Sequence, residues 1–202
     1  MSPIQRDFPL FPLSTVLFPG GRLPLQIFEP RYIDLVRDCL RTNQGFGLVG
    51  IREGREAGSA ARPWHVGTLA RIIDWDQGEN GLLNILIQGE ERFDILETRV
   101  GKGQLVVADV TWRQPVLACE CTHAFTQLKA LVENLLQENA ATAEGVSLLA
   151  RSEPVEFVYS LLGLLPLPPA LKVEFLDINE SDALVNAALE FLRALNPNKS
   201  HH

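Results

Sequence analysis

The sequence is poor in cysteine and has no excess of basic residues, and each shortage excludes a class of protein. It has three cysteines, Cys39, Cys119 and Cys121, whose spacing fits no disulfide framework, which indicates a reducing compartment. Its formal net charge of −7 argues against a broad phosphate-binding face, because nucleic-acid-binding proteins usually carry a basic stripe. We therefore expect neither a disulfide-stapled secreted protein nor binding to nucleic acid.

Long apolar runs are also missing. The longest, such as LLGLLPLPPAL, are too short and too rich in proline to span a bilayer core of about 30 Å. The N-terminus, MSPIQRDFPLFPL, has an acid and prolines where a signal peptide needs a basic start and an unbroken apolar core. These features predict a cytoplasmic protein with no membrane partner.

Motifs for catalysis or cofactor binding are absent from the sequence. Its Gly-Lys pair lacks the other residues of a phosphate-binding P-loop, and no G-x-S-x-G elbow occurs. His65 and His123 have no recognisable nucleophile as a partner. Cys119, Cys121 and His123 lack a fourth ligand for a structural zinc site, so we interpret the cysteines as ordinary thiols. We expect no catalytic residue, no metal and no cofactor.

The composition is that of a globular protein, and its first part has the pattern of a β structure. Hydrophobic residues make up 46% and charged residues 21%, and a chain of 202 residues can bury roughly 70% of its unfolded surface. Between residues 8 and 113, apolar residues come in short runs separated by glycines, which is typical of strands. We predict strands over residues 8–13, 23–28, 46–51, 68–75, 82–89, 92–100 and 105–112.

Two hairpins and one helix complete the prediction for this part. Asn80-Gly81 favours a hairpin turn, and a second hairpin is expected through residues 101–104. Residues 30–43 instead place Tyr32, Val36 and Cys39 on one stripe of a helix. Short strands without regular strand-helix alternation predict an α+β fold, with a mostly antiparallel barrel and one packed helix.

The second part has helical periodicity. Residues 122–139, 143–151, 154–165, 168–177 and 181–195 each fit a helix, and the last ends before Asn196-Pro197. We predict a barrel subdomain over residues 1–114, a helical bundle over 115–197 and a flexible tail over 198–202. The apolar faces of so few helices also need the barrel to cover them, so no free hinge is expected.

Three stretches of the sequence resemble one known family. FPLFPLSTVLFPGGRLPLQIFEPRYIDLV, at the start, resembles the opening of the N-terminal, substrate-recognition domain of the ATP-dependent protease Lon. GTLARI (67–72) and LLNILIQGEERFDIL (82–96) resemble the next strands of that domain, including Gly89 and Arg92. FVYSLLGLLPLPPALKVEFLDINESDALVNAALEFL (157–192) resembles its helical part. The similarity spans nearly the whole chain in the same order.

The resemblance implies a pseudobarrel of the PUA-like class followed by a helical bundle, in agreement with the periodicity. It also implies a role in recognising protein substrates and in oligomerisation. The ATPase and peptidase modules of the family have no counterpart in the sequence, so we expect a module without catalytic activity. The expected partners are unfolded or tagged protein segments or a partner protease, with a homo-oligomer as a further option.

Within this frame, the polar stretch 52–65 is the candidate peptide-binding surface. It is the one long insertion rich in glycine and alanine among the strands, and we predict that it forms a loop. Trp64 is its large aromatic residue and, with Arg62 and His65, could anchor a peptide. The competing interpretation is that Trp64 simply packs under the loop.

A second prediction concerns structure rather than binding. Glu29 and Arg31 flank Pro30 at the junction between a strand and a helix, and Arg92 lies on a strand that the barrel could bring alongside. We predict an orienting cluster of ion pairs or hydrogen bonds among these three side chains. The alternatives left open for function are binding of RNA or a nucleotide derivative by the barrel, and an enzyme with a pocket between barrel and bundle.

Overall fold

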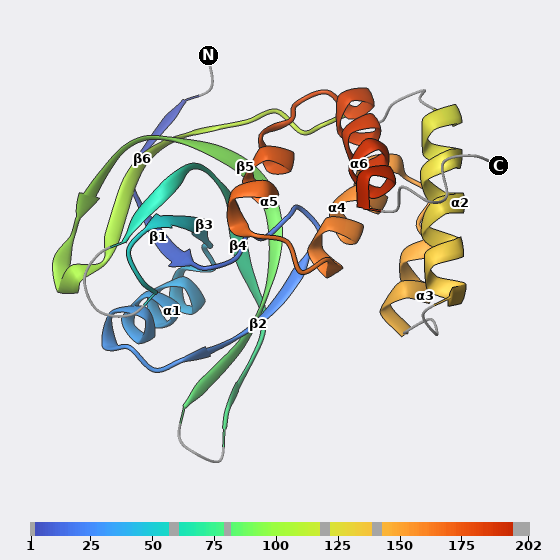
Figure 1. Cartoon of the computed structure of the whole chain (residues 1–202). Coiled ribbons are helices and arrows are strands. Elements are labelled where there is room, and N and C mark those ends of the chain that lie inside the picture. Colours follow the sequence, from blue (N-terminus) through green and yellow to red (C-terminus); the bar gives the residue numbers. More distant parts are fainter. Residues whose placement is uncertain (1–2, 57–60, 79–81, 118–121, 139–142, 196–202) are drawn as a thin grey trace. The chain divides into compact units, whose positions relative to one another are not determined.

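The computed structural model describes residues 3–56, 61–78, 82–117, 122–138 and 143–195 (Figure 1). By their internal contacts the residues form two compact units. The first comprises Met1–Gln114 and Pro166–Leu176, and the second comprises Pro115–Leu165 and Asp177–His202. The predicted tail over residues 198–202 and the turn at Asn80-Gly81 lie outside the described residues.

Six strands form the sheet of the first unit. They are β1 (Ile4–Leu13), β2 (Arg22–Ile27), β3 (Phe46–Glu53), β4 (Arg62–Gln77), β5 (Leu83–Val100) and β6 (Val106–Trp112). Their order is β2-β5-β4-β3-β1-β6, and an additional pairing of β5 with β6 closes the sheet into a barrel. The β1–β3 pairing is parallel, whereas the other described pairings are antiparallel. The predicted α+β class is confirmed.

The inside of the barrel is packed by aromatic and aliphatic side chains. Phe93 makes edge-to-face contacts with Phe8 and Trp112 at centroid distances of 5.5 and 5.8 Å. A Cβ atom on Gly67 would lie 2.5 Å from Phe93 Cζ, so a glycine is needed to make room for the ring. The buried members of this cluster are Phe8, Leu10, Val49, Leu69, Phe93, Val106, Ala108 and Val110.

Helix α1 (Pro30–Thr42) covers a second apolar cluster. It begins after Glu29 with a proline in its first turn, and it ends at Asn43, whose φ of 52° is left-handed. The helix buries Tyr32, Leu35, Val36 and Cys39 against strand residues that include Ile85 and Ile87. The Tyr32 ring stacks on Phe11 at a centroid distance of 3.9 Å. The predicted packed helix is therefore present.

A turn at Pro19–Gly21 is attached to the middle of β5. Gly20 N donates to Gly89 O at 2.8 Å, and Gly89 N donates to Gly21 O at 2.9 Å. Gly20 has a φ of 76°, which a residue with a side chain rarely adopts. A Cβ atom on Gly89 would lie 2.3 Å from the Phe18 carbonyl oxygen. The two backbones approach so closely that position 89 has no room for a side chain.

Two predictions about strand boundaries are wrong. The predicted strands 82–89 and 92–100 are one continuous strand, β5, because Gly89 serves the close approach of the turn rather than a break. The predicted loop 52–65 is shorter than expected, since β3 continues to Glu53 and β4 begins at Arg62. The hairpin through residues 101–104 is confirmed: β5 and β6 pair around a short 3-10 helix, η1 (Lys102–Gln104).

The second unit contains α2 (Thr122–Glu138), α3 (Ala143–Leu149), α4 (Pro154–Leu164) and α6 (Ser181–Leu195). Phe125 of α2 contacts Phe157 of α4 edge to face at a centroid distance of 5.4 Å. Lys129 Nζ lies above both rings and donates to the Arg151 carbonyl at 3.1 Å. Arg193 of α6 donates to Gln127 of α2 at 2.7 Å. These contacts join the helices around a core that includes Leu128, Phe157, Leu162, Leu184 and Val185.

Helix α5 (Pro169–Asp177) differs from the other C-terminal helices, because its residues up to Leu176 group with the barrel. Arg92 of β5 donates to the Leu176 carbonyl, and Val173 lies 3.7 Å from the point that a Cβ atom on Gly50 of β3 would occupy. The bundle predicted over residues 115–197 thus contains a segment that packs with the strands.

Candidate functional site

Arg62, Trp64 and His65 lie at the start of β4 and not in a loop. Arg62 and His65 are exposed, and the Arg62 guanidinium lies 3.6 Å from a Glu53 carboxylate oxygen. Trp64 is half-buried: the Arg52 guanidinium lies 5.5 Å above its ring, and a Cβ atom on Gly50 would lie 3.1 Å from Trp64 Cδ1. Its Nε1 is buried and has no hydrogen-bond partner among the described residues. The structure therefore places Trp64 partly under its neighbours.

The structure brings Glu29 and Arg31 together. Arg31 Nη2 lies 2.9 Å from Glu29 Oε2, and both side chains are largely withdrawn from solvent. The same guanidinium donates to the backbone carbonyls of Gln104 and Glu56 at 3.1 and 3.3 Å and lies 4.7 Å from the Tyr32 ring. One cation thus holds the start of α1 against two loops of the barrel.

Arg92, the third member of the predicted cluster, is directed elsewhere. Arg92 is 3% exposed, and its guanidinium donates to the Leu176 carbonyl at 2.8 Å and to the Gln114 carbonyl at 3.4 Å. These acceptors are backbone oxygens at the two points where the chain leaves the first unit. Arg92 therefore fixes chain segments and does not complete the pair at Glu29.

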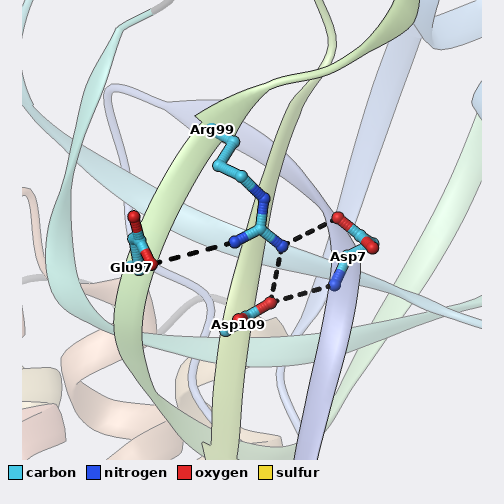
Figure 2. Close-up of polar contacts among 4 residues, drawn as sticks. All are labelled: Asp7, Glu97, Arg99 and Asp109. Atoms are coloured by element: carbon cyan, nitrogen blue, oxygen red, sulfur yellow. Dashed lines mark hydrogen bonds and ion pairs between the residues drawn. The ribbon is translucent and has the colours of Figure 1, made fainter.

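A further charged cluster surrounds Arg99 (Figure 2). Arg99 Nη2 lies 2.6 Å from Asp109 Oδ1 and 2.8 Å from Asp7 Oδ1, and Nη1 lies 4.0 Å from Glu97 Oε2. Asp7 N donates to Asp109 Oδ1 at 3.2 Å, where β1 has an irregularity and Asp7 a φ of 53°. The hydrogen bond from Arg99, helped by the one from Asp7 N, holds the pKa of Asp109 below its usual value. The cluster joins β5, β6 and β1.

The outer halves of β4 and β5 form a projecting hairpin, which with β2 makes a three-stranded structure. We call it the arm: residues 22–27 of β2, 71–77 of β4 and 83–88 of β5 (Figure 1). Trp75 is 57% exposed, and Ile73 beside it is exposed as well. Trp75 stands opposite Ile85, a buried residue of the cluster under α1, so its ring extends that apolar face beyond the covered core.

Sequence reasoning missed the arm as a candidate site. The residues Ile73-Asp74-Trp75-Asp76 place an aromatic between two acids, but within a predicted strand such a pattern only indicates that one face meets water. Trp75 lies beyond the part of β4 that β3 covers, because β3 begins at Phe46, which pairs with Ala70. How far β3 extends along β4 is determined by the pairing of strands in the fold and cannot be read from the local sequence.

The structure shows no arrangement for metal binding in the part of the chain that it describes: no group of three or more His, Cys, Asp or Glu side chains could hold an ion there. Cys119 and Cys121 lie outside that part. Burial, with Asp38 nearby, raises the pKa of the Cys39 thiol to about 11, so this thiol stays protonated near neutral pH. Of the described helices, none has the length and apolar character needed to traverse a bilayer.

Comparison with known proteins defines the class. The model of the ATP-dependent protease La (LON) substrate-binding domain matches residues 7–194, so the chain belongs to this family of substrate-binding domains. The resemblance found in the sequence is thereby confirmed.

Solved structures agree over nearly the whole chain. The Lon N-terminal domain protein from Xanthomonas campestris is 34% identical, with a TM-score of 0.73 over 93% of this chain and 97% of that one. The N-terminal domain of Mycobacterium avium complex Lon protease has a TM-score of 0.72 at 19% identity, covering 96% of this chain and 100% of that one. The second likeness is one of fold.

Curated relatives are longer than this chain. The Lon protease of Anaeromyxobacter dehalogenans is 36% identical over 96 residues, which are 46% of this chain and 11% of that protein. Protein cereblon of Xenopus tropicalis is 21% identical over 244 residues, which cover 93% of this chain and 54% of cereblon. The matches thus span about a tenth of that protease and about half of cereblon.

Proposed function

We propose that this substrate-binding domain binds exposed segments of unfolded or tagged polypeptides and performs no catalysis itself. The family match over residues 7–194 carries the proposal, and the 34% identity to a Lon N-terminal domain protein over almost the full chain supports it. In this role it acts as an adaptor or client-binding protein, with a separate protease as a partner. We place it in the cytoplasm, in keeping with its few, irregularly spaced cysteines.

Two exposed aromatic residues of the first unit favour polypeptide as the ligand. Trp75 is 57% and Phe28 60% exposed, and large aromatic side chains are the usual anchors of protein-binding surfaces. The net charge of −7 disfavours the alternative of RNA, whose phosphates need a basic surface.

The test compares one protein in two states. A protein held unfolded by reduction and alkylation is labelled, and its fluorescence anisotropy is followed as this chain is added; the native form of the same protein is the control. We expect binding of the unfolded form only. Binding of neither form, or equal binding of both, would contradict the proposal. Salt-sensitive retention of a single-stranded RNA would favour the alternative instead.

The start of β4 is a second proposed contact, through Trp64 with Arg62 and His65. Trp64→Ala separates its two interpretations. Loss of binding to the unfolded protein at an unchanged melting temperature would support an anchor, and a lower melting temperature with unchanged binding would assign Trp64 to packing. Since Arg52 and the backbone near Gly50 already cover part of the ring, we expect the lower melting temperature.

A further inference from the structure

The arm has an open edge along β4. Strand β3 pairs with β4 only as far as Ala70, and the Arg71 side chain is engaged by Asn43 O and Glu90. Beyond that point β5 continues to pair with β4 as far as Gln77. Among the described residues, no strand lies against the other side of residues 72–77 (Figure 1). Unpaired backbone groups on a strand edge are a template for another strand.

The opposite edge of the arm, along β2, is a poor template by comparison. Pro24 stands in the middle of β2 and has no N–H to donate, which is a common way to block an edge. Residues 72–77 contain no proline. Of the two edges, the one on β4 is the one that can accept a strand.

The backbone of Trp75 faces this open edge. Its N–H donates to its neighbour's carboxylate, Asp74 Oδ1, at 2.9 Å. In an antiparallel pair, a residue whose N–H is not directed to the partner strand belongs to a non-hydrogen-bonded pair, so its N–H and C=O point outward. The Trp75–Ile85 pair is of this kind. Because the two kinds of pair alternate along the strands, the Gln77–Leu83 pair is of the same kind, and the Gln77 N–H also points outward. The Asp74 carboxylate therefore accepts a hydrogen bond from the Trp75 N–H, which an added strand would otherwise accept.

The side chains around this edge suit a cationic and apolar ligand. Trp75 and Ile73 are exposed apolar groups, and an irregularity in the register lies between Ile72 and Asp74. Asp74 and Asp76 are exposed on either side of Trp75, and neither carboxylate has an ion pair within the described ranges. Two uncompensated negative charges beside an exposed indole attract lysine or arginine next to an apolar residue.

We propose that the outer edge of β4, residues 72–77, binds an extended polypeptide segment as an added strand and prefers segments that combine basic and apolar residues. This inference rests on the proposed function and states how and what the domain binds. The incoming backbone replaces Asp74 at the Trp75 N–H, and the released carboxylate pairs with a basic side chain of the segment. The indole of Trp75 packs across the new strand pair.

A short labelled peptide that alternates lysine with valine and threonine is the probe, titrated against the full chain by fluorescence anisotropy. Its partner peptides replace lysine by glutamate, or carry N-methyl groups on the amides of one strand edge only. We expect the glutamate peptide and one of the two possible N-methyl peptides to bind at least about tenfold more weakly. Equal binding of all the peptides would overturn strand addition.

Variants of the chain locate the site. Gln77→Pro removes an outward N–H and Trp75→Ala removes the ring, and each is expected to weaken binding about tenfold. Leu96→Ala, which truncates an apolar side chain of similar exposure on β5 outside the arm, is the matched control and is expected to bind normally. Circular dichroism melting checks that each variant is folded. Should Gln77→Pro fail to fold, the N-methyl peptides still decide the question.

The charge preference has its own pair of variants. Asp74→Asn combined with Asp76→Asn is expected to reduce the difference between the lysine and glutamate peptides to less than about threefold. Glu133→Gln, which removes an exposed carboxylate of α2 in the second unit, is expected to leave that difference unchanged. An unchanged difference in the double variant would overturn the role of these acids.

The outcomes separate this inference from the proposed function. The unfolded protein could bind equally well to the wild type and to all the variants at residues 72–77. That result would overturn strand addition at this edge and leave the proposed function standing. No binding of any polypeptide would overturn both. Concentration-dependent dimerisation that Gln77→Pro abolishes, without peptide binding, would assign the edge to a second copy of the chain.

Discussion

Strands β4 and β5 each have an inner half that belongs to the barrel and an outer half that belongs to the arm. The inner half of β4 pairs with strands on both sides, and residues 66–70 are all buried. Among the described residues, the outer half pairs only with β5, and residues 73–77 are all exposed. Chain connectivity is the same in both halves. The number of neighbouring strands decides whether a stretch of strand builds a core or presents a surface.

Charged side chains divide along the same line. In the barrel, Arg92 is bound to backbone carbonyls, and Arg99 is shared between Asp7 and Asp109. On the arm, Asp74 and Asp76 are exposed and have no ion pair in the described part of the chain. Barrel variants should therefore change stability, whereas arm variants should change binding.

The largest loss of stability is expected from Arg92→Ala. The carbonyl of the buried residue Leu176 and that of Gln114 lose a charged donor, and such hydrogen bonds contribute roughly 1.5–3 kcal/mol each, so we expect a loss of about 3 kcal/mol in the free energy of unfolding. Urea unfolding followed by tryptophan fluorescence measures it, because Trp64, Trp75 and Trp112 all lie in the first unit. Arg71→Ala, at a half-exposed ion pair, is the control and should cost less than about 1 kcal/mol. Equal effects of the two would contradict the assigned role of Arg92.

Gly89→Ala is expected to follow, with a loss of about 2 kcal/mol. The new methyl group would meet the Phe18 carbonyl, and both backbones are held by hydrogen bonds, so relief requires a backbone shift. The same fluorescence transition reports the change. Gly163→Ala, where a Cβ atom meets nothing within 4 Å, should leave the transition in place. A wild-type midpoint for Gly89→Ala would refute the close approach.

Acid should weaken the seam around Asp109 by a smaller amount. Its pKa is lower in the folded chain than the usual 3.8, because Arg99 and the Asp7 N–H bind the carboxylate. The stabilisation is therefore complete above the unfolded pKa and is lost as the pH falls through the lower, folded value. Urea midpoints measured from pH 6 downward should fall less steeply in Asp109→Asn than in the wild type. Parallel curves would show that the carboxylate contributes no pH dependence.

The smallest effect on stability is expected from Trp75→Ala. An exposed residue with a neighbouring strand on one side loses little on truncation, so the free energy of unfolding should change by less than about 0.5 kcal/mol. Binding of the lysine peptide should nevertheless fall. A loss of stability as large as that of Gly89→Ala would show that Trp75 belongs to the core and would erase the contrast between barrel and arm.

Much of the fold could be predicted from the sequence because it depends on local patterns. The stripe containing Tyr32, Val36 and Cys39 predicted the packed helix, and the apolar runs predicted strands. The separation of strands 82–89 and 92–100 was wrong, because Gly89 is needed for the close approach of the turn at Pro19–Gly21, which is far away in the sequence. The grouping of α5 with the strands likewise depends on the contact between Arg92 and Leu176, which are far apart in sequence.

The candidate site was harder to predict than the fold. The polar sequence neighbours of Trp64 predicted an exposed anchor, yet the Arg52 guanidinium lies over part of its ring. Trp75 lies in an apolar strand pattern, yet it is exposed in the part of β4 that extends beyond the pairing of Phe46 in β3 with Ala70. Exposure of one strand residue is set by how far its neighbours extend, and no local pattern contains that information.

The attachment of the Pro19–Gly21 turn at Gly89 has a mechanical consequence. Gly89 lies where the arm part of β5 ends and the barrel part begins. Two backbone hydrogen bonds to the turn therefore fix the base of the arm, while its far end projects freely. A pulling force on a polypeptide paired with β4 would be transmitted to this attachment between Gly89 and the turn. We therefore expect the stiffness of the arm to depend on Gly89 and the Pro19–Gly21 turn as well as on the residues that contact the bound segment.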